Sequence, residues 1–181
     1  MSDEVSPDDQ QRLLRLAREA LEARVQDRTP PPIESGGALD WPRGAFVTIH
    51  SGGDLRGCLG QIGPDAPLGE IVAHLAAVVS DSDPRFDPVT PRELTDIEIE
   101  ISVLTPEREV ASAEEVEVGR HGVIIEEGAH RGLLLPQVAT EQRWDRDTLL
   151  SHACLKARLP PDAWRHGARI LVFEAQIFGE R

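Results

Sequence analysis

The sequence is poor in several residue types on which other classes of protein depend. Its 181 residues include no tyrosine, only 4% aromatic residues, a single lysine (Lys156) and two cysteines (Cys58 and Cys154). The core must therefore be mainly aliphatic, and two cysteines exclude a disulfide framework or a paired-cysteine metal motif. The start MSDEVSPDDQ is too polar and acidic for a signal peptide, and no apolar run approaches the ~20 residues of a membrane span. These absences predict a cytoplasmic protein with reduced thiols.

The chain is strongly acidic. It has 19 Lys and Arg residues against 32 Asp and Glu residues, a formal net charge of −13. Such a charge repels nucleic-acid phosphates and anionic membrane surfaces, so we expect no nucleic acid and no membrane among its partners. The proportions of hydrophobic (40%) and charged (28%) residues are those of a globular protein. The length suits one domain, or two small halves that share one core.

Local signals predict an α+β protein. Ser6-Pro7-Asp8-Asp9 combines a capping residue, a proline and acidic side chains, as helix starts do. Gly52-Gly53 marks a hairpin turn, and apolar residues alternate with polar ones over residues 96–103, as in a strand with one buried face. The expected elements are helices over 6–25, 68–79 and 145–158, strands over 44–51, 55–62, 96–103, 122–126, 131–135 and 170–178, a polar, proline-rich connection over 26–42, and short helical turns after Thr90 and from Pro136.

Two segments of the chain are similar to each other. DLRGCLGQI (54–62) and HRGLLLPQV (130–138) both occupy the return strand of an expected hairpin and both precede a helix. Each contains Arg-Gly and then Leu-x-Gln followed by Ile or Val, with one residue of slippage. Two related β-hairpin–helix units packed into one antiparallel sheet would explain the match. Chance similarity is the alternative for so short a segment.

Cys58 is the first candidate for chemistry. It follows Gly57 and precedes Gly60 by two residues, and glycines inside a strand often mark the close approach of a ligand or of another backbone. In a regular strand Arg56 would share its face, and a nearby Arg favours a nucleophilic thiolate. The alternative, which the residues alone favour, is a small buried hydrophobe beside a packing glycine.

The spacing of the hairpin argues against a histidine base for Cys58. If Gly52-Gly53 is a two-residue turn, Val47 lies opposite Cys58 and His50 points to the other face. Cys58 would then share its face with Val47 and Ile49. Only a β-bulge would bring His50 and Cys58 to one face, so a Cys–His pair is not expected.

Metal ligation is not predicted either. His152 and Cys154 are two residues apart on an expected helix and point in different directions, so they cannot hold one ion. The sequence has no HExxH, CxxC or glycine-rich phosphate loop. His121, in the turn-like segment Gly119-Arg-His-Gly122, remains a candidate to approach Cys58 from the second unit.

Two further groups carry polar candidates. In Asp83-Pro84-Arg85-Phe86, the proline stiffens a loop in which Arg85 beside Phe86 would bind an anion or a planar group. In the alternative, Phe86 fills the core and Arg85 is solvated. Gln137 and Glu141 lie one turn apart if Pro136 starts a helix, and they either face a cleft together or are simply solvated.

A series of short motifs runs through most of the chain in a fixed order. They are Gly44-Ala-Phe-Val-Thr48, Leu55-Arg-Gly-Cys-Leu-Gly60, Asp83-Pro-Arg-Phe86, Ile101-Ser-Val-Leu-Thr-Pro106, Gly119-Arg-His-Gly122, Leu134-Leu-Pro-Gln-Val138, Trp144-Asp145 and Cys154-Leu-Lys-Ala157. In this order they resemble one family, the AMMECR domain, whose prokaryotic members are called AmmeMemoRadiSam system protein A. The resemblance extends from about Arg12 to Phe178, and Leu59 replaces the isoleucine of the family's hallmark Leu-Arg-Gly-Cys-Ile-Gly.

The resemblance implies a single domain over residues 1–181 with subdomains of about 1–105 and 106–181 around one curved antiparallel sheet with flanking helices. It also implies a cleft lined by the hexapeptide, but no known reaction and no named cofactor. Cys58 is the candidate catalytic residue, and the candidate ligand-binding residues are Arg56, Gly57, Gly60, Arg85, His121 and Gln137.

The family's name also implies partners: a Memo-type protein and a radical S-adenosylmethionine enzyme. This chain has neither a three-cysteine cluster motif nor a dioxygenase ligand set, so it is expected to be neither of them. Two hypotheses follow. In one, the protein is an enzyme or substrate-handling subunit with a small-molecule cleft centred on Cys58. In the other, it is a non-enzymatic binding or adaptor module for those partners.

Overall fold

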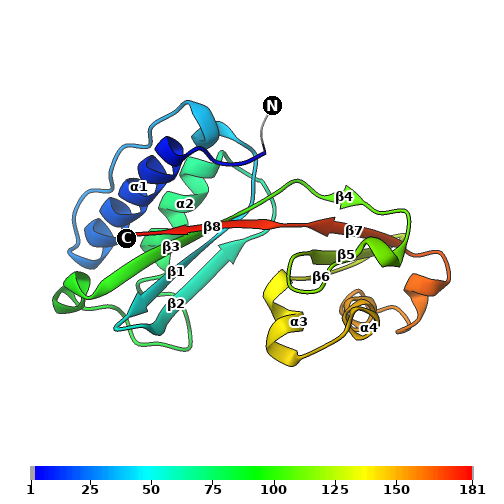
Figure 1. Cartoon of the computed structure of the whole chain (residues 1–181). Helices are drawn as coiled ribbons and strands as arrows, with labels where there is room; N and C mark the ends of the chain where they lie inside the picture. The colour runs from blue at the N-terminus through cyan, green and yellow to red at the C-terminus, as the bar shows by residue number, and fades with distance from the viewer. Residues whose placement is uncertain (1–2, 181) are drawn as a thin grey trace. The chain divides into compact units, whose positions relative to one another are not determined.

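The computed structural model describes residues 3–180 (Figure 1). The chain forms two compact units: unit 1 runs to Thr105 and resumes at Gln176, and unit 2 is Pro106–Ala175. Each unit combines helices with a four-stranded antiparallel sheet, so the α+β class is confirmed, although the strands form two sheets where the prediction had one. None of the helices within residues 3–180 has the length and apolar character needed to cross a bilayer.

Unit 1 packs two helices against one face of its sheet. Its elements are α1 (Pro7–Val25), η1 (Gly37–Asp40), β1 (Ala45–Ser51), β2 (Asp54–Gln61), α2 (Leu68–Val78), η2 (Pro91–Thr95), β3 (Ile97–Leu104) and β8 (Ala175–Gly179). The strand order is β2-β1-β3-β8. Helices α1 and α2 lie side by side (Figure 1), and their apolar sides form one core with alternate residues of β1 and β3. We call this helix-covered face the near face of the sheet, and the opposite one the far face.

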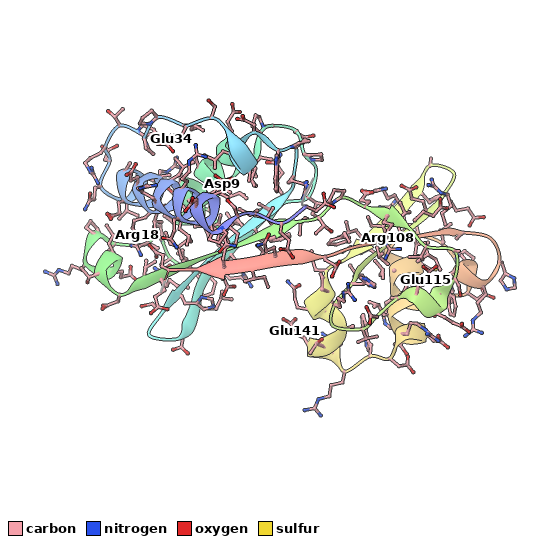
Figure 2. The ribbon with its side chains drawn as sticks, turned by 45° about the horizontal axis from the view of Figure 1, so that its top comes forward. Asp9, Arg18, Glu34, Arg108, Glu115 and Glu141 are labelled. Atoms are coloured by element: carbon pink, nitrogen blue, oxygen red, sulfur yellow. The ribbon has the colours of Figure 1, made fainter. Side chains whose placement is uncertain are left out.

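Helix α1 begins where the sequence predicts. The hydroxyl of Ser6 accepts a hydrogen bond from the Asp9 N–H at 3.2 Å, and Pro7 occupies the first turn. Further along α1 (Figure 2), the Arg18 guanidinium donates to the Ile97 carbonyl and to the Glu180 carboxylate, both at 2.6 Å. Arg18 therefore fastens α1 to β3 and to the end of the chain.

Unit 2 packs its longest helix against the sheet. Its elements are β4 (Arg108–Glu109), η3 (Ala113–Glu115), β5 (Gly122–Glu127), β6 (His130–Leu134), α3 (Pro136–Gln142), α4 (Arg146–Lys156), η4 (Ala163–Arg165) and β7 (Arg169–Phe173), in the strand order β4-β7-β5-β6. Leu150 and Cys154 of α4 share a core with Ile125 and Val172. The Asp145 carboxylate caps α4 by accepting the Thr148 N–H at 2.8 Å.

The last expected strand is in fact two. The prediction of one strand over residues 170–178, with Phe173 and Ile177 on one face, is wrong. Strand β7 ends at Phe173 and β8 begins at Ala175, and the two belong to different sheets. The interruption at Glu174 breaks the alternation, because Ile177 is 60% exposed whereas Phe178 is buried. The same passage between sheets occurs earlier, where β3 of unit 1 leads directly to β4 of unit 2.

The β1–β2 hairpin has a β-bulge close to its turn. The turn is the predicted Gly52-Gly53, with positive φ angles of 60° and 88° that favour glycine. The register then shifts after Ile49, which pairs with Gly57. Arg56 is thereby left as the extra residue of the return strand.

The bulge reverses the faces expected for the return strand. Cys58 pairs with Thr48, whose side chain lies on the far face, so the prediction that Cys58 faces Val47 and Ile49 is wrong. The prediction rested on an uninterrupted register, and one extra residue turns every later side chain to the opposite face. His50, two residues from Thr48, is on the far face as well. The prediction that His50 and Cys58 lie on opposite faces is therefore also wrong.

The two hairpins share a construction. In each, a buried glycine of the return strand, Gly57 or Gly132, pairs with an isoleucine. The C-cap residue of a helix packs on each glycine: Val79 of α2 on the first and Ala157 of α4 on the second. The extra Arg56 places Gly57 one residue further from its turn than Gly132 is from the turn of the second hairpin. When each sheet is listed from the return strand of its hairpin, the strand orders are β2-β1-β3-β8 and β6-β5-β7-β4. The hairpin thus has the same place in both sheets, which agrees with two related units.

Candidate functional site

The Cys58 thiol lies on the far face of the unit 1 sheet. Its residue is half-buried, and the Thr48 hydroxyl on the neighbouring strand donates a hydrogen bond to the sulfur at 3.2 Å. Since the side chain points away from the aliphatic core of unit 1, packing in that core does not explain the cysteine.

A buried carboxylate holds the backbone at Cys58. Asp83 is only 4% exposed, and its Oδ2 accepts the Cys58 N–H at 3.0 Å. Strand β2 is an edge of the sheet, so this N–H has no strand partner and needs another acceptor. Asp83 also accepts bonds from Arg85: from its N–H at 3.1 Å, its Nε at 3.0 Å and its Nη2 at 2.7 Å. One carboxylate therefore fixes both the thiol-bearing strand and a guanidinium.

The charges of this group are strongly coupled. The pKa of Asp83 lies well below its usual range, because the hydrogen bonds from Arg85 outweigh the opposing effect of burial. The pKa of Arg85 is raised, mainly by its hydrogen bonds to Asp83. The Arg85 side chain is 57% exposed, and within residues 3–180 its Nη1 makes no hydrogen bond. Arg85 is therefore the accessible cation beside the thiol.

Arg56 takes a different place from the one predicted, because the bulge removes it from the regular register. Its Nε and Nη2 donate to the two oxygens of Glu93 at 2.9 and 3.3 Å, and this pairing is the main reason that the pKa of Glu93 falls to about 2. Glu93 also completes the predicted capping box by accepting the Thr90 N–H at 2.7 Å. Arg56, at 17% exposure, is thus a tie between β2 and η2.

The aromatic ring of the Asp83–Phe86 loop joins these two cations. The Arg56 and Arg85 guanidinium carbons lie 6.0 and 5.3 Å from the centroid of the Phe86 ring, within the range of cation–π contacts. Phe86 is half-buried, so it does not fill the core, as one of the two alternatives from the sequence had it. The loop therefore places a ring and an accessible guanidinium beside Cys58.

Both glycines of the hexapeptide admit other groups of the protein. A Cβ on Gly57 would lie 3.1 Å from the Val79 side chain, on the near face. A Cβ on Gly60 would lie 2.2 Å from the ring of Phe46, which pairs with it across the hairpin. Gly57 thus seats a helix end, and Gly60 lets an aromatic ring lie flat on the strand next to Cys58.

The other two predicted ligand-binding residues belong to unit 2. His121 is 3% exposed, its Nδ1 accepts the Glu117 N–H at 3.0 Å, and burial lowers its pKa. A neutral His121 therefore stabilises the turn before β5. Gln137 is exposed on α3 and its side chain makes no hydrogen bond within residues 3–180, and the same holds for the side chain of Glu141 one turn further on (Figure 2).

The second cysteine differs sharply from the first. Cys154 is fully buried, and burial raises the pKa of its thiol, as its helical position beside Leu150 predicts. His152 instead stacks on Trp144 with ring centroids 3.9 Å apart, so the two side chains do point to different faces. Within residues 3–180 no three or more His, Cys, Asp or Glu residues gather in a way that could hold a metal ion.

Two residues of the site were not singled out from the sequence. Thr48 was quoted only as the end of a strand motif, and Asp83 only as the first residue of a loop. A signal for Asp83 existed, because an Asp two residues before an Arg in a proline-stiffened loop can accept bonds from that residue's backbone and side chain. Thr48 had no local signal, since its contact with Cys58 depends on the bulge.

Comparison with known proteins places this chain in a family. The AMMECR1 family model matches residues 14–178. The chain is 45% identical over 187 residues to a protein of Thermofilum pendens, covering 93% of this chain and 88% of that protein. It is 42% identical to protein MK0488 of Methanopyrus kandleri, covering 99% and 92%. The crystal structure of the uncharacterized protein PH0010 from Pyrococcus horikoshii matches with a TM-score of 0.73 and 37% identity, over 93% of this chain and 90% of that one.

The fold and the comparisons together define an α+β protein with a half-buried cysteine on an edge strand. The chain belongs to the AMMECR1 family. The resemblance drawn from its motifs is therefore confirmed.

Proposed function

We propose that unit 1 is a substrate-handling module in which Cys58 is the reactive group of a small-molecule site. The observation that carries the proposal is the double role of Asp83, which holds the Cys58 N–H and the Arg85 guanidinium with one carboxylate. A carboxylate this deeply buried is expensive to desolvate. Its position is best explained if the thiol and the cation must keep a constant relation.

Each residue has a definite part in this proposal. Cys58 is the nucleophile or the covalent anchor, and the Thr48 hydroxyl donates to its sulfur. Arg85 binds an anionic group of the ligand through its free Nη1, and Phe86 supports it from one side. Arg56, paired with Glu93, holds the strand in place and does not meet the ligand.

One observation favours a second function, docking to a protein partner. Leu55 and Ile62, at the two ends of the β2 segment, are 41% and 45% exposed, so the Cys58 strand is flanked by apolar side chains in contact with solvent. In this alternative the hexapeptide lies beneath a surface for a Memo-type protein or a radical S-adenosylmethionine enzyme. Both functions are compatible if the partner delivers or receives the ligand.

Timed alkylation of the folded protein with iodoacetamide tests the proposal, with Cys154 as the internal control. We expect Cys58 to be modified at least about tenfold faster, because Cys154 is fully buried and its neutral form predominates. Peptide mapping at successive times gives the two rates. Equal or slower labelling of Cys58 would remove the thiol from the proposed site.

Mass spectrometry of the native protein separates the two functions. A small molecule that co-purifies with the wild type and not with Cys58→Ala supports substrate handling. A stable complex with either partner that persists in Cys58→Ala but is lost in Leu55→Asp supports docking.

A further inference from the structure

Polar groups continue from Cys58 across the far face of the sheet. Cys58 on β2 pairs with Thr48 on β1, and Thr48 pairs with Glu100 on β3. The three side chains form one row on one face, since paired residues of an antiparallel sheet point the same way. Two strand spacings separate the ends of the row, about 10 Å.

Glu100 differs from the other carboxylates near the site. Asp83 forms an ion pair with Arg85, and Glu93 forms one with Arg56. Glu100 is half-buried, yet within residues 3–180 its side chain makes no hydrogen bond and no ion pair. Its negative charge is therefore directed to the far face without compensation, in a position where hydration is already reduced.

The accessible positive charge lies on the other side of the thiol. The Cys58 N–H points away from β1 to Asp83, so the loop that carries Arg85 lies beyond the edge of the sheet. Going inward from that edge, the order is the Arg85 guanidinium, the Cys58 thiol, the Thr48 hydroxyl and the Glu100 carboxylate. A cation and an anion thus flank the reactive sulfur.

We infer that the ligand of the Cys58 site is a small zwitterion, with an anionic group for Arg85 and an ammonium or similar N–H donor for Glu100. This inference rests on the proposed function of Cys58 and names its substrate class. A purely anionic ligand leaves Glu100 unpaired and repelled, and a purely cationic one is repelled by Arg85. A molecule that carries both charges satisfies both groups while its centre lies over the sulfur.

Thiol–disulfide exchange with reagents of different charge tests this substrate class. The Cys58 thiolate attacks one sulfur of the reagent, the new S–S bond forms as the old one breaks, and the departing thiolate takes up a proton from water. Four symmetric disulfides serve as probes: bis(2-hydroxyethyl) disulfide (neutral), cystamine (cationic), 3,3′-dithiodipropionate (anionic) and cystine (zwitterionic). Mass spectrometry follows the mixed disulfide on Cys58, and every rate is divided by that of the neutral reagent. Comparing each variant with the wild type then cancels the intrinsic reactivities of the reagents.

We expect Glu100→Gln to slow cystamine by about threefold or more and to leave dithiodipropionate unslowed, because only the attraction for a cation is lost. Arg85→Gln should have the opposite selectivity, and both variants should slow cystine. Glu100→Asp, which keeps the charge, should retain most of the wild-type rate with cystamine. The matched controls are Glu70→Gln in α2 and Arg92→Gln in η2, and both residues are exposed. These substitutions change the net charge equally and should leave all ratios unchanged.

The outcomes separate this inference from the proposed function. If Cys58 reacts rapidly but Glu100→Gln and Glu70→Gln give the same ratios, the thiol site stands and the zwitterionic substrate class is overturned. If no reagent reaches Cys58, both fail. If Glu100→Gln does not fold, the wild type alone decides: 0.5 M salt should reduce the normalised rates of cystine and cystamine, and unchanged rates would reject the inference.

Discussion

The hairpin of unit 1 and the hairpin of unit 2 have the same framework and different contents. Both have a two-residue turn, a buried glycine in the return strand and a helix end packed on that glycine. In unit 2 the residue after the glycine is Leu133, which pairs with the fully buried Ile124. In unit 1 the equivalent pair is Cys58 and Thr48. The same construction therefore serves packing in one unit and presents a thiol in the other.

The difference arises from two additions in unit 1. The bulge at Arg56 shifts the register of β2 against β1 by one residue after the turn. The Asp83–Phe86 loop covers the edge of β2. The pairing of β5 with β6 in unit 2 has no such bulge, and the backbone of α4 occupies the space beside Gly132. A helix end packed so closely stabilises the strand, whereas the contact of Val79 with Gly57 in unit 1 is more open.

The two glycines provide the largest test of this comparison. A Cβ on Gly132 would lie 2.3 Å from the Ala157 nitrogen and 2.6 Å from the Ala153 oxygen, whereas one on Gly57 would meet the Val79 side chain at 3.1 Å. We expect Gly132→Ala to destabilise the protein by about 2–3 kcal/mol and Gly57→Ala by about 1 kcal/mol. Urea unfolding measures both. The reverse order would mean that unit 1 has the tighter packing of the two.

The edge carboxylate of unit 1 gives a pH-dependent test. The pKa of Asp83 and that of Glu93 (about 2) are lower in the folded state than the usual values near 4. Their bonds therefore stabilise the fold fully above about pH 5, and this stability is lost as the pH falls through 4 towards 2. We expect Asp83→Asn to lower the free energy of unfolding by about 1–3 kcal/mol at pH 7.

The difference between Asp83→Asn and the wild type should narrow at pH 3, because the Asp83 carboxyl of the unfolded wild type is then largely protonated and folding must remove that proton. The control is Asp87→Asn, an exposed residue of the same loop, which should change little at either pH. A gap as wide at pH 3 as at pH 7 would show that the Asp83 charge is not what holds the loop.

The two thiols provide an intermediate test. Cys154→Ser places a hydroxyl in the fully buried core of unit 2, and we expect a loss of about 1–2 kcal/mol. Cys58→Ser should change the stability by less than about 0.5 kcal/mol, because the residue is half-buried and Thr48 can bond to the new oxygen. Thermal melts of the two variants decide. A large loss for Cys58→Ser would make Cys58 chiefly structural.

The arginines that precede the two glycines, Arg56 and Arg131, should show the smallest effects. Arg56 is 17% exposed and grips Glu93 with two bonds, whereas Arg131 is 42% exposed and pairs with Glu107 and Glu126 on the surface. We expect Arg56→Gln to lower the free energy of unfolding by about 1 kcal/mol and Arg131→Gln by less than about 0.5 kcal/mol. Chemical denaturation in low and high salt measures both. Salt should weaken the contribution of Arg131 more than that of Arg56.

Much of the fold could be predicted because its signals are local. The cap at Ser6, the glycine turn at 52–53, the capping box at Thr90 and the alternation along β3 each depend on a few neighbouring residues. The break at Glu174 could not be predicted in this way, because the chain there changes sheets without any proline or glycine. Such a change is decided by which sheet has an edge open to the strand.

The candidate site shows the same division. Its hexapeptide and its Asp83–Phe86 loop were recognised from their sequence, and so were Cys58 and Arg85 as candidates. Their relation was not, since it depends on an acceptor 25 residues away for one N–H of an edge strand. His121 and Gln137 are assigned by the structure to unit 2, where the first supports a turn and the second is exposed.

By itself, the sequence determined the family, the α+β class, nearly every helix and strand, and the buried state of Cys154, because periodicity and turn chemistry are properties of adjacent residues. Only the tertiary structure decided which face Cys58 occupies. One extra residue at Arg56 turns the side chain from the core to the far face, and no local preference in the sequence marks it. The energy of that choice comes from Asp83, Glu93 and Val79, which reach β2 from other parts of the chain.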